Sequence, residues 1–258
     1  MKRFFLLVLL ILLVVFVFFS FRKTIPTEVF SVNNIVYGLF PVSSDNCELI
    51  THDYYSLCYN EKHEQATWVY YLLSDSMIVG PAERKNYFSP DTLVSTKTVT
   101  YTAYKNSGFD RGHLLPAADM KWSQEAMNET FYMSNISPQN PYFNRSGLWR
   151  KSESKVRDWV KTKGALHVFV GGVLSNELTK LPEQNISVPF YFYKILFDES
   201  NNSTVAFLLE NKKVEGELIN FVVSIDSIEA LTKIDFFSSL PDSLENSIEK
   251  TTALKGWF

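Results

Sequence analysis

Cysteine is scarce in this chain. Of 258 residues only Cys47 and Cys58 are cysteines, which excludes a cysteine metal cluster and a framework of several disulfides. Their spacing allows one bridge in an oxidising compartment and equally allows two unrelated thiols, and we expect them to be unpaired. Internal repeats are also missing. The hydrophobic content of 46% and the charged content of 21% exclude a disordered chain and predict a globular domain with a substantial core.

Net charge is small as well, at −3, which by itself argues against a polyanionic partner. The charges are unevenly spread, however. Residues 84–163 carry 13 basic and 7 acidic side chains, whereas the segments on either side have an acidic excess. A local positive field attracts an anionic ligand whatever the total charge. We therefore expect this stretch to bind an anionic substrate, with a solvated, lysine-rich helix face as the alternative.

The sequence contains one long apolar run, residues 4–21, which is interrupted only by Ser20. Basic residues flank it on both sides, and as a helix it would span about 27 Å, at the short end for a membrane span. A cleaved signal peptide is the alternative, although no small-residue cleavage pattern follows the run. We expect an uncleaved membrane anchor, with the rest of the chain outside the cytoplasm or exported to the periplasm or the medium.

The pattern beyond this run predicts one α+β domain over residues 51–258, preceded by the anchor or signal segment at 1–23 and a linker at 24–50. Strands are expected at 54–59, 67–73, 166–174, 188–197, 204–209 and 219–224, and helices at 123–130, 146–163, 226–231 and 241–250. Loops are expected at 80–98 and 134–144. Ser123 would cap the first helix, and Gly164 would end the second.

The stretch GFDRGHLLPAADM, at residues 108–120, combines four residues suited to chemistry. His113 can accept a proton from water near neutral pH. Arg111 is a permanent cation whose donors suit phosphate oxygens, and Gly112 lets the backbone approach a ligand closely. Asp110 could hold the imidazole or brace the turn. A charged surface turn is the alternative for the whole row.

Further polar groups follow this stretch. Asn135 and Asn144 lie at the two ends of the proline-containing loop, and Glu153 follows Trp149 in the expected basic helix. An asparagine and a glutamate near one helix start, with a histidine on a neighbouring strand, can hold a hard cation through oxygen atoms and waters. On spacing alone, Asn144 could instead cap the helix and Glu153 could be a solvated helix residue. Trp149 is expected in the core.

The order of the motifs DRGHLLPAADM, SNISPQ and FNRSGLWRKSE resembles that of the DNA/RNA non-specific endonuclease family, the ββα-metal or His-Me finger nucleases. The segments TWVYYLL, RKNYFSPD and VPFYFYKILF are also similar to parts of that family, and the resemblance runs from about Tyr54 to about Ile248. It implies an α+β fold with a mixed sheet core and a ββα-metal active-site motif. It also implies hydrolysis of phosphodiester bonds in DNA and RNA, with Mg²⁺ as cofactor and Mn²⁺ as a substitute.

Carried over by position, the resemblance implies a general base at His113 and a direct Mg²⁺ ligand at Asn144. Glu153 would orient water molecules bound to the metal. Arg111 and Arg84 would hold the phosphate as charge develops in the transition state. Contacts would go mainly to the nucleic-acid backbone, so that cleavage is indifferent to sequence and sugar.

Asn135, by the same resemblance, would hold the active-site loop or the substrate. The interval from Asn144 to Trp149 is one residue longer than the family spacing, and this leaves a second function open. That function is a nuclease-fold protein with weak or no catalysis, which binds nucleic acid or an envelope partner. An enzyme acting on another anionic phosphodiester is a third hypothesis. The sequence does not determine the oligomeric state.

Overall fold

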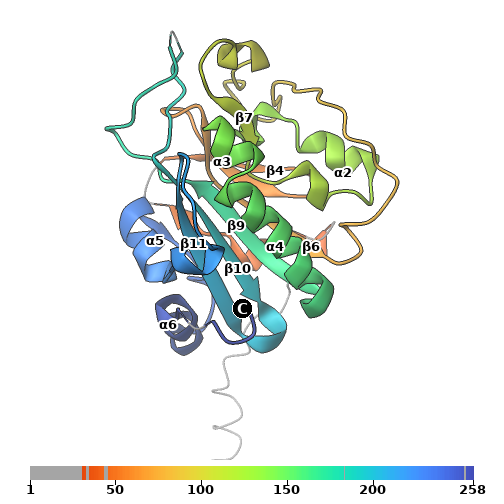
Figure 1. Cartoon of the computed structure of the whole chain (residues 1–258), viewed down its shortest axis with the longest axis vertical. Coiled ribbons are helices and arrows are strands. Elements are labelled where there is room, and N and C mark those ends of the chain that lie inside the picture. Colours follow the sequence, from red (N-terminus) through yellow and green to blue (C-terminus); the bar gives the residue numbers. More distant parts are fainter. Residues whose placement is uncertain (1–30, 33–34, 44–45, 183, 253) are drawn as a thin grey trace, which may run out of the picture. The chain divides into compact units, whose positions relative to one another are not determined.

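A seven-stranded sheet forms the centre of the structure, a computed structural model that describes residues 31–32, 35–43, 46–182, 184–252 and 254–258 (Figure 1). The strand order is β12-β11-β10-β9-β6-β5-β4, and every pairing in this sheet is antiparallel. The strands are β4 (Glu48–Thr51), β5 (Ser56–Asn60), β6 (Gln65–Ser74), β9 (Ala165–Gly172), β10 (Tyr191–Asp198), β11 (Ser203–Glu210) and β12 (Val222–Val223). The α+β class is confirmed. The expectation of a mixed sheet is wrong, because no two neighbouring strands of this sheet run parallel.

Helices cover both faces of this sheet, so its strands are buried on both sides. Along β9, Val168 packs in the same cluster as α4 (Leu148–Lys163), which crosses in front of the sheet in Figure 1. The next residue, Phe169, packs in the cluster that contains α5 (Ile225–Thr232) and α6 (Asp242–Lys250). This alternation follows the two-residue period of a strand. It also explains why the strand sequences are nearly continuous hydrophobic runs.

The helix α4 carries the amphipathic pattern that the sequence predicts. Its buried face includes Trp149, Val156 and Val160, which pack against the sheet, while Lys151 and Lys161 on the other side are exposed. Gly164 ends the helix with a φ of +83°, a conformation that glycine adopts without strain, and its N–H donates to the carbonyl of Val160. The helix and its C-terminal stop are therefore confirmed.

A separate two-stranded ribbon carries the Asp-Arg-Gly-His row. The row is the strand β7 (Asp110–His113), which pairs antiparallel with β8 (Ile136–Gln139). The short helix α3 (Pro141–Arg145) follows directly, with Asn140 capping it and Pro141 in its first turn. The expectation of a loop over 134–144 is therefore wrong. Pro138 and Pro141 both fit regular structure although proline has no backbone N–H. A strand in a two-stranded ribbon makes backbone hydrogen bonds along one edge only, and the N–H groups in the first turn of a helix have no partner within the helix.

The remaining elements are short. They are α2 (Gln124–Glu129), β1 (Ser31–Val32), β2 (Ile35–Val36), β3 (Val42–Ser43), β13 (Ile234–Asp235), η1 (Tyr37–Leu39), η2 (Tyr101–Tyr104), η3 (Ala117–Asp119), η4 (Met133–Asn135), η5 (Glu199–Asn201) and η6 (Leu218–Phe221). Ser123 caps α2 through its hydroxyl, as predicted. The linker expected at 24–50 is corrected, because β3 and the edge strand β4 begin inside it. Segments of two to four residues are too short to show a period.

Two expected elements near the C-terminus also differ from the structure. The strand predicted at 219–224 is reduced to β12, because residues Leu218–Phe221 form a 3₁₀ helix. Pro241 precedes α6 as its N-cap instead of lying in its first turn. The strands predicted around β5, β6, β9, β10 and β11, and the helices α5 and α6, are confirmed within a few residues.

The two cysteines form a disulfide, which corrects the expectation that they are unpaired. Cys47 directly precedes β4, and Cys58 lies in β5, where it pairs with Leu49. The hairpin brings the two Cα atoms to 5.4 Å, a separation suited to a bridge. Their linear spacing carries no information on this register, so the sequence alone left both possibilities open.

Removing this disulfide should lower the free energy of unfolding by about 3 kcal/mol, the chain-entropy value for a closed loop of this length. Urea denaturation of the Cys47→Ser/Cys58→Ser double variant against the oxidised parent measures the difference. Adding a thiol reductant should destabilise the parent and leave the double variant unchanged. Equal stability of parent and variant would contradict the prediction.

The apolar run 4–21 lies outside the described residues, and so does the expected boundary at residue 23. In the part of the chain that the structure describes, no helix is both long enough and apolar enough to cross a membrane. Residues from Ser31 to the C-terminus form one compact unit.

Candidate active site

A cavity of about 500 Å³ collects most of the residues that the sequence analysis singled out. Six residues were predicted to act in catalysis or metal binding. All of them except Asn135 line the cavity: Arg84, Arg111, His113, Asn144 and Glu153. Three basic side chains that the sequence analysis did not single out line it too: Lys121, Arg145 and Arg150. Glu153 is the one carboxylate in this lining, against five basic groups. The positive charge of residues 84–163 is thus concentrated on a concave surface that suits an anionic ligand.

His113 is the last residue of β7 and lies between two aromatic rings. Its imidazole packs edge-on against Phe131, with ring centroids 4.7 Å apart, and lies 5.6 Å from the ring of Phe88. It is 7% exposed, and its Nε2 has no hydrogen-bond partner among the described residues. Burial, and then the positive charge of Arg84, lower the pKa of His113 to about 3. The imidazole is therefore neutral at physiological pH, the protonation state in which a general base must start.

Gly112 is required by the close pairing of β7 with β8. A Cβ atom placed on Gly112 would lie 2.1 Å from the side-chain amide carbon of Gln139, which is fully buried. A larger residue would displace Gln139 or separate the two strands. The glycine thus keeps the ribbon in the register that brings His113 to the cavity.

Arg111 is held over the aromatic side of the cavity. Its guanidinium carbon lies 4.6 Å from the ring centroid of Phe88 and 5.8 Å from that of Tyr101. Stacking of this kind fixes the plane of the guanidinium while its N–H groups stay available to a ligand. Arg111 also lines the neighbouring pocket that contains Tyr101 and Tyr87, so it connects the cavity with an aromatic surface.

Arg84 reaches the cavity from the long loop before β7. Its guanidinium lies 5.4 Å from the ring of Phe131, which also contacts His113, and its Nε donates to Oδ1 of Asn86 at 3.0 Å. Burial lowers the pKa of Arg84. Lys85 lines a different pocket, so Arg84 is the residue of this pair that faces the cavity.

Asp110 does not hold the imidazole, one of the two roles considered for it. Its Oδ2 accepts hydrogen bonds from Nδ2 of Asn144 at 2.9 Å and from Nε of Arg145 at 2.7 Å. Although burial acts in the opposite direction, the bonds from Arg145 and Asn144 hold the pKa of Asp110 below its usual range. Asp110 therefore ties β7 to α3 and fixes the orientation of the Asn144 amide.

Asn144 is part of α3 and does not cap α4, so the capping alternative is wrong. Gly147 precedes α4, and Asn140 caps α3. Because Asp110 receives the Asn144 N–H, the amide oxygen of Asn144 is turned away from that bond. Among the described residues no donor is bonded to this oxygen, which leaves it available to a ligand in the cavity.

Asn135 is fully buried and does not line the cavity. Its Oδ1 accepts from the N–H of Leu115 at 2.9 Å, and its Nδ2 donates to the carbonyls of Leu115 and Thr130. These bonds fasten the chain just after His113. Of the two roles implied for Asn135, the structure places it where it can hold the loop and not where it can touch a substrate.

Glu153 lies one helical turn beyond the start of α4 and is 8% exposed, so it is not a solvated helix residue. Burial raises the pKa of Glu153 to about 7, against the opposing influence of Lys194. Arg150 approaches its carboxylate to 3.8 Å. A carboxylate at this position can accept or release a proton, or bind water, near neutral pH.

A buried lysine on the sheet beneath α4 acts on the carboxylate of Glu153, because its positive charge lowers the pKa of that group. Lys194, on β10, is 1% exposed; its Nζ lies 4.3 Å from the Trp149 ring and 3.3 Å from Oγ of Ser152. Burial lowers the pKa of Lys194 to about 8. Asp119, also buried, accepts a hydrogen bond from Arg157 at 2.7 Å. Charges of both signs therefore extend from the cavity into the core beneath α4.

The residues present fit a hard divalent cation. Mg²⁺ prefers oxygen ligands and needs only one or two from the protein, because it retains most of its water molecules. The unpaired amide oxygen of Asn144 and the carboxylate of Glu153 are offered to one cavity. Asp110 orients the first of them, as partners behind metal ligands do.

A model of the family described as DNA/RNA non-specific endonuclease matches residues 33–243. The chain belongs to this family. It is 34% identical over 225 residues to the mouse protein named nuclease EXOG, mitochondrial, covering 79% of this chain and 60% of that protein. It is 33% identical to a protein named nuclease from Nostoc sp., over 78% of this chain and 77% of the relative. The chain thus spans between three fifths and four fifths of these family members.

The fold of this chain is similar to that of a solved structure. A chain in the crystal structure titled EndoG/EndoGI complex, on the mechanism of EndoG inhibition, superposes with a TM-score of 0.69 at 24% identity. The match covers 76% of this chain and 88% of that chain. At this level of identity the match establishes the fold.

Several residues of the site were missed by the sequence analysis. Lys121, Arg145 and Arg150 were counted in the basic stretch, but nothing in their spacing distinguished them from its exposed lysines. Lys194 lies in the strand predicted at 188–197, and no role was predicted for it. Its one signal is that position: a lysine at the centre of the run FYFYKILF must be buried on one face of a covered sheet.

Proposed function

We propose that this family member is a metal-dependent endonuclease that hydrolyses phosphodiester bonds of DNA and RNA without sequence preference. One observation carries the proposal. The neutral imidazole of His113 shares a cavity with five basic side chains and with the oxygen ligands Asn144 and Glu153. A base, an anion site and a cation site together are the set that phosphodiester hydrolysis needs.

In this proposal His113 takes the proton from a water molecule as its oxygen attacks phosphorus. The new P–O bond forms as the bond to the 3′ oxygen breaks, and the leaving oxygen is protonated from solvent. The low pKa of His113 keeps the imidazole unprotonated before the reaction. The rings of Phe88 and Phe131 hold it in place, so that little reorganisation is needed when substrate binds.

The basic side chains bind and stabilise the phosphate. Arg111 and Arg84, each stacked on a phenylalanine ring, present fixed donors to its non-bridging oxygens, where charge accumulates in the transition state. Asn144 would hold Mg²⁺ or Mn²⁺ directly and Glu153 would hold it through water molecules; when bound, the ion neutralises charge on the phosphate and the leaving oxygen. Because these groups address the backbone, both deoxyribose and ribose substrates fit the same chemistry.

Cleavage assays test this proposal. Purified protein is incubated with supercoiled plasmid and with single-stranded RNA, in Mg²⁺ and in excess EDTA. We expect both substrates to be degraded in Mg²⁺ and neither in EDTA. Salt-sensitive binding of both nucleic acids without cleavage, at any Mg²⁺ or Mn²⁺ concentration, would contradict the proposal and favour the catalytically inactive alternative.

A further inference from the structure

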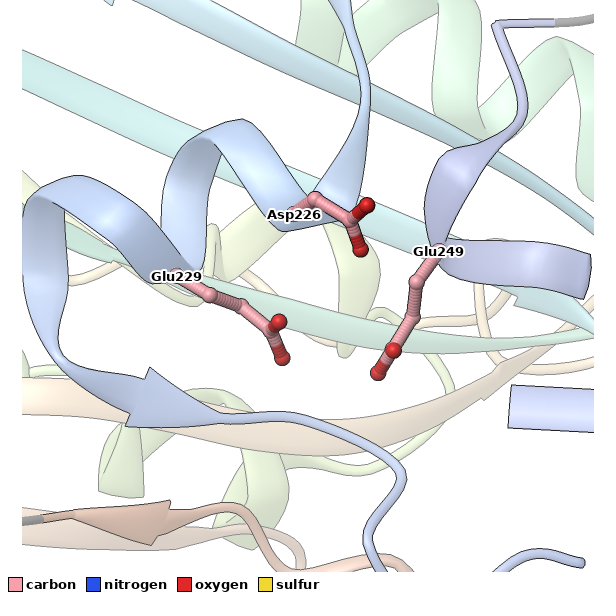
Figure 2. Close-up of side chains that lie close together, drawn as sticks. All are labelled: Asp226, Glu229 and Glu249. Carbon is pink, nitrogen blue, oxygen red and sulfur yellow. The ribbon is translucent and has the colours of Figure 1, made fainter. Parts of the chain in front are cut away.

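Three carboxylates from two helices converge on the side of the sheet opposite α4. Asp226 and Glu229 project from α5, and Glu249 projects from α6 (Figure 2). One carboxylate oxygen from each of the three lies within 4.8 Å of the others. Three ionised carboxylates at this separation would repel one another strongly, so a proton or a cation must compensate them.

Glu249 is the member of this group that most clearly lacks a partner. It is 7% exposed, and its Oε1 is buried and accepts no hydrogen bond from the described residues. Figure 2 shows its side chain directed toward the carboxylates of Asp226 and Glu229. A buried carboxylate oxygen without a donor is costly, and in a stable fold it is normally bound to something.

The surroundings of Glu249 are acidic. Burial, and then Glu229, Glu245, Asp226 and Asp235, raise the pKa of Glu249 to about 8. Asp235 and Glu245 form a second, more exposed trio with the same glutamate. Four further carboxylates, from α5, α6 and β13, therefore lie near Glu249.

We propose that Asp226, Glu229 and Glu249 bind a calcium ion that links α5 to α6. Ca²⁺ is held by oxygen atoms at about 2.3–2.6 Å, so ligands on opposite sides of it are separated by about 5 Å. The three carboxylate oxygens lie within 4.8 Å of one another, which is compatible with this size. Carboxylate oxygens are the ligands that Ca²⁺ prefers, and water molecules complete its flexible coordination shell.

This site is distinct from the nuclease cavity in both position and sequence. The helices α5 and α6 pack in a different core cluster from α4, on the other face of the sheet. Glu249 also lies beyond residues 33–243, which the family model matches. The ion would therefore stabilise the packing of the C-terminal helix and take no part in hydrolysis.

Calorimetric titration of the purified full chain with CaCl₂ tests the proposal, with the Asn144→Ala variant as background so that the nuclease cavity does not contribute. We expect a dissociation constant of about 0.1–1 mM. Glu249→Gln and Asp226→Asn should each weaken binding more than about tenfold. Glu217→Gln removes an exposed carboxylate elsewhere and is the matched control, for which affinity should not change.

Thermal unfolding gives a second readout. At ten times the dissociation constant, Ca²⁺ should raise the Tm of the protein by about 4 °C and leave that of Glu249→Gln unchanged. Without calcium, Glu249→Gln should be at least as stable as the parent, because it removes a carboxyl group that its acidic neighbours disfavour in the ionised form. An equal calcium-induced shift in the two proteins would overturn the proposal. So would the absence of binding heat at millimolar CaCl₂, which would mean that protons alone relieve the repulsion.

Discussion

Replacing His113 by alanine should lower the rate of DNA and RNA cleavage by about a thousandfold at saturating Mg²⁺. The neutral imidazole is the proposed general base, and no other histidine lines the cavity. Binding of nucleic acid should persist, because the five basic side chains remain. Initial rates of plasmid nicking and of RNA cleavage, with binding measured in EDTA, separate the two effects.

His167→Gln is the control for this experiment. His167 packs with Tyr70 and Phe197 in the cluster on the opposite face of the sheet, and its replacement should leave the rate within about twofold. Wild-type rates in His113→Ala, in preparations that cut both substrates, would contradict the assignment of the base.

The pH dependence of stability gives an independent readout on His113. Its folded-state pKa of about 3 lies below the unfolded value of about 6.5, so the unfolded chain binds the additional proton. The neutral buried imidazole is therefore tolerated above pH of about 6.5 and destabilises the fold as the pH falls from there toward about 3. Over that range the parent should lose more unfolding free energy than His113→Ala does, as measured by urea denaturation.

Replacing Asn144 by alanine should lower activity by at least about a hundredfold and raise the Mg²⁺ concentration needed for half-maximal rate. Its amide oxygen is the proposed metal ligand, and Asp110 orients the amide. Asp110→Ala should raise the Mg²⁺ requirement by about ten- to a hundredfold, because it frees the amide to rotate. Rates measured across a Mg²⁺ titration separate a weaker metal site from a slower chemical step.

Asn220→Ala is the matched control, since Asn220 is exposed and distant in sequence from the cavity residues. It should behave as the parent does. An Asn144→Ala variant with an unchanged Mg²⁺ requirement would contradict its assignment as a ligand, even if the rate fell.

The sequence predicted which residues share the cavity better than it predicted the elements that form it. His113, Arg111 and Asn144 could be found because motif residues with distinctive chemistry stand in a fixed order. The strand β8 and helix α3 could not, because Pro138 and Pro141 are strong local signals for a loop. The pairing of β8 with β7 depends on contacts between distant segments, which no local propensity contains.

The sequence also could not predict the burial of the site residues or their pKa values. The spacing of Glu153 shows which helix face it shares, but the pKa of its carboxyl depends on burial against the sheet beneath α4 and on Lys194, forty-one positions away. The Cys47–Cys58 bridge depends on a hairpin register in the same way. Long-range packing decides such features, and it decides the pKa values with them.

The location of Mn²⁺ in a crystal of the protein, measured by its anomalous scattering, tests the central claim most directly. The account predicts a Mn²⁺ ion bound to the amide oxygen of Asn144, in the cavity that also holds His113 and Glu153. A fully occupied Mn²⁺ ion elsewhere on the protein, with the Asn144 oxygen unligated in a preparation that degrades DNA, would contradict it.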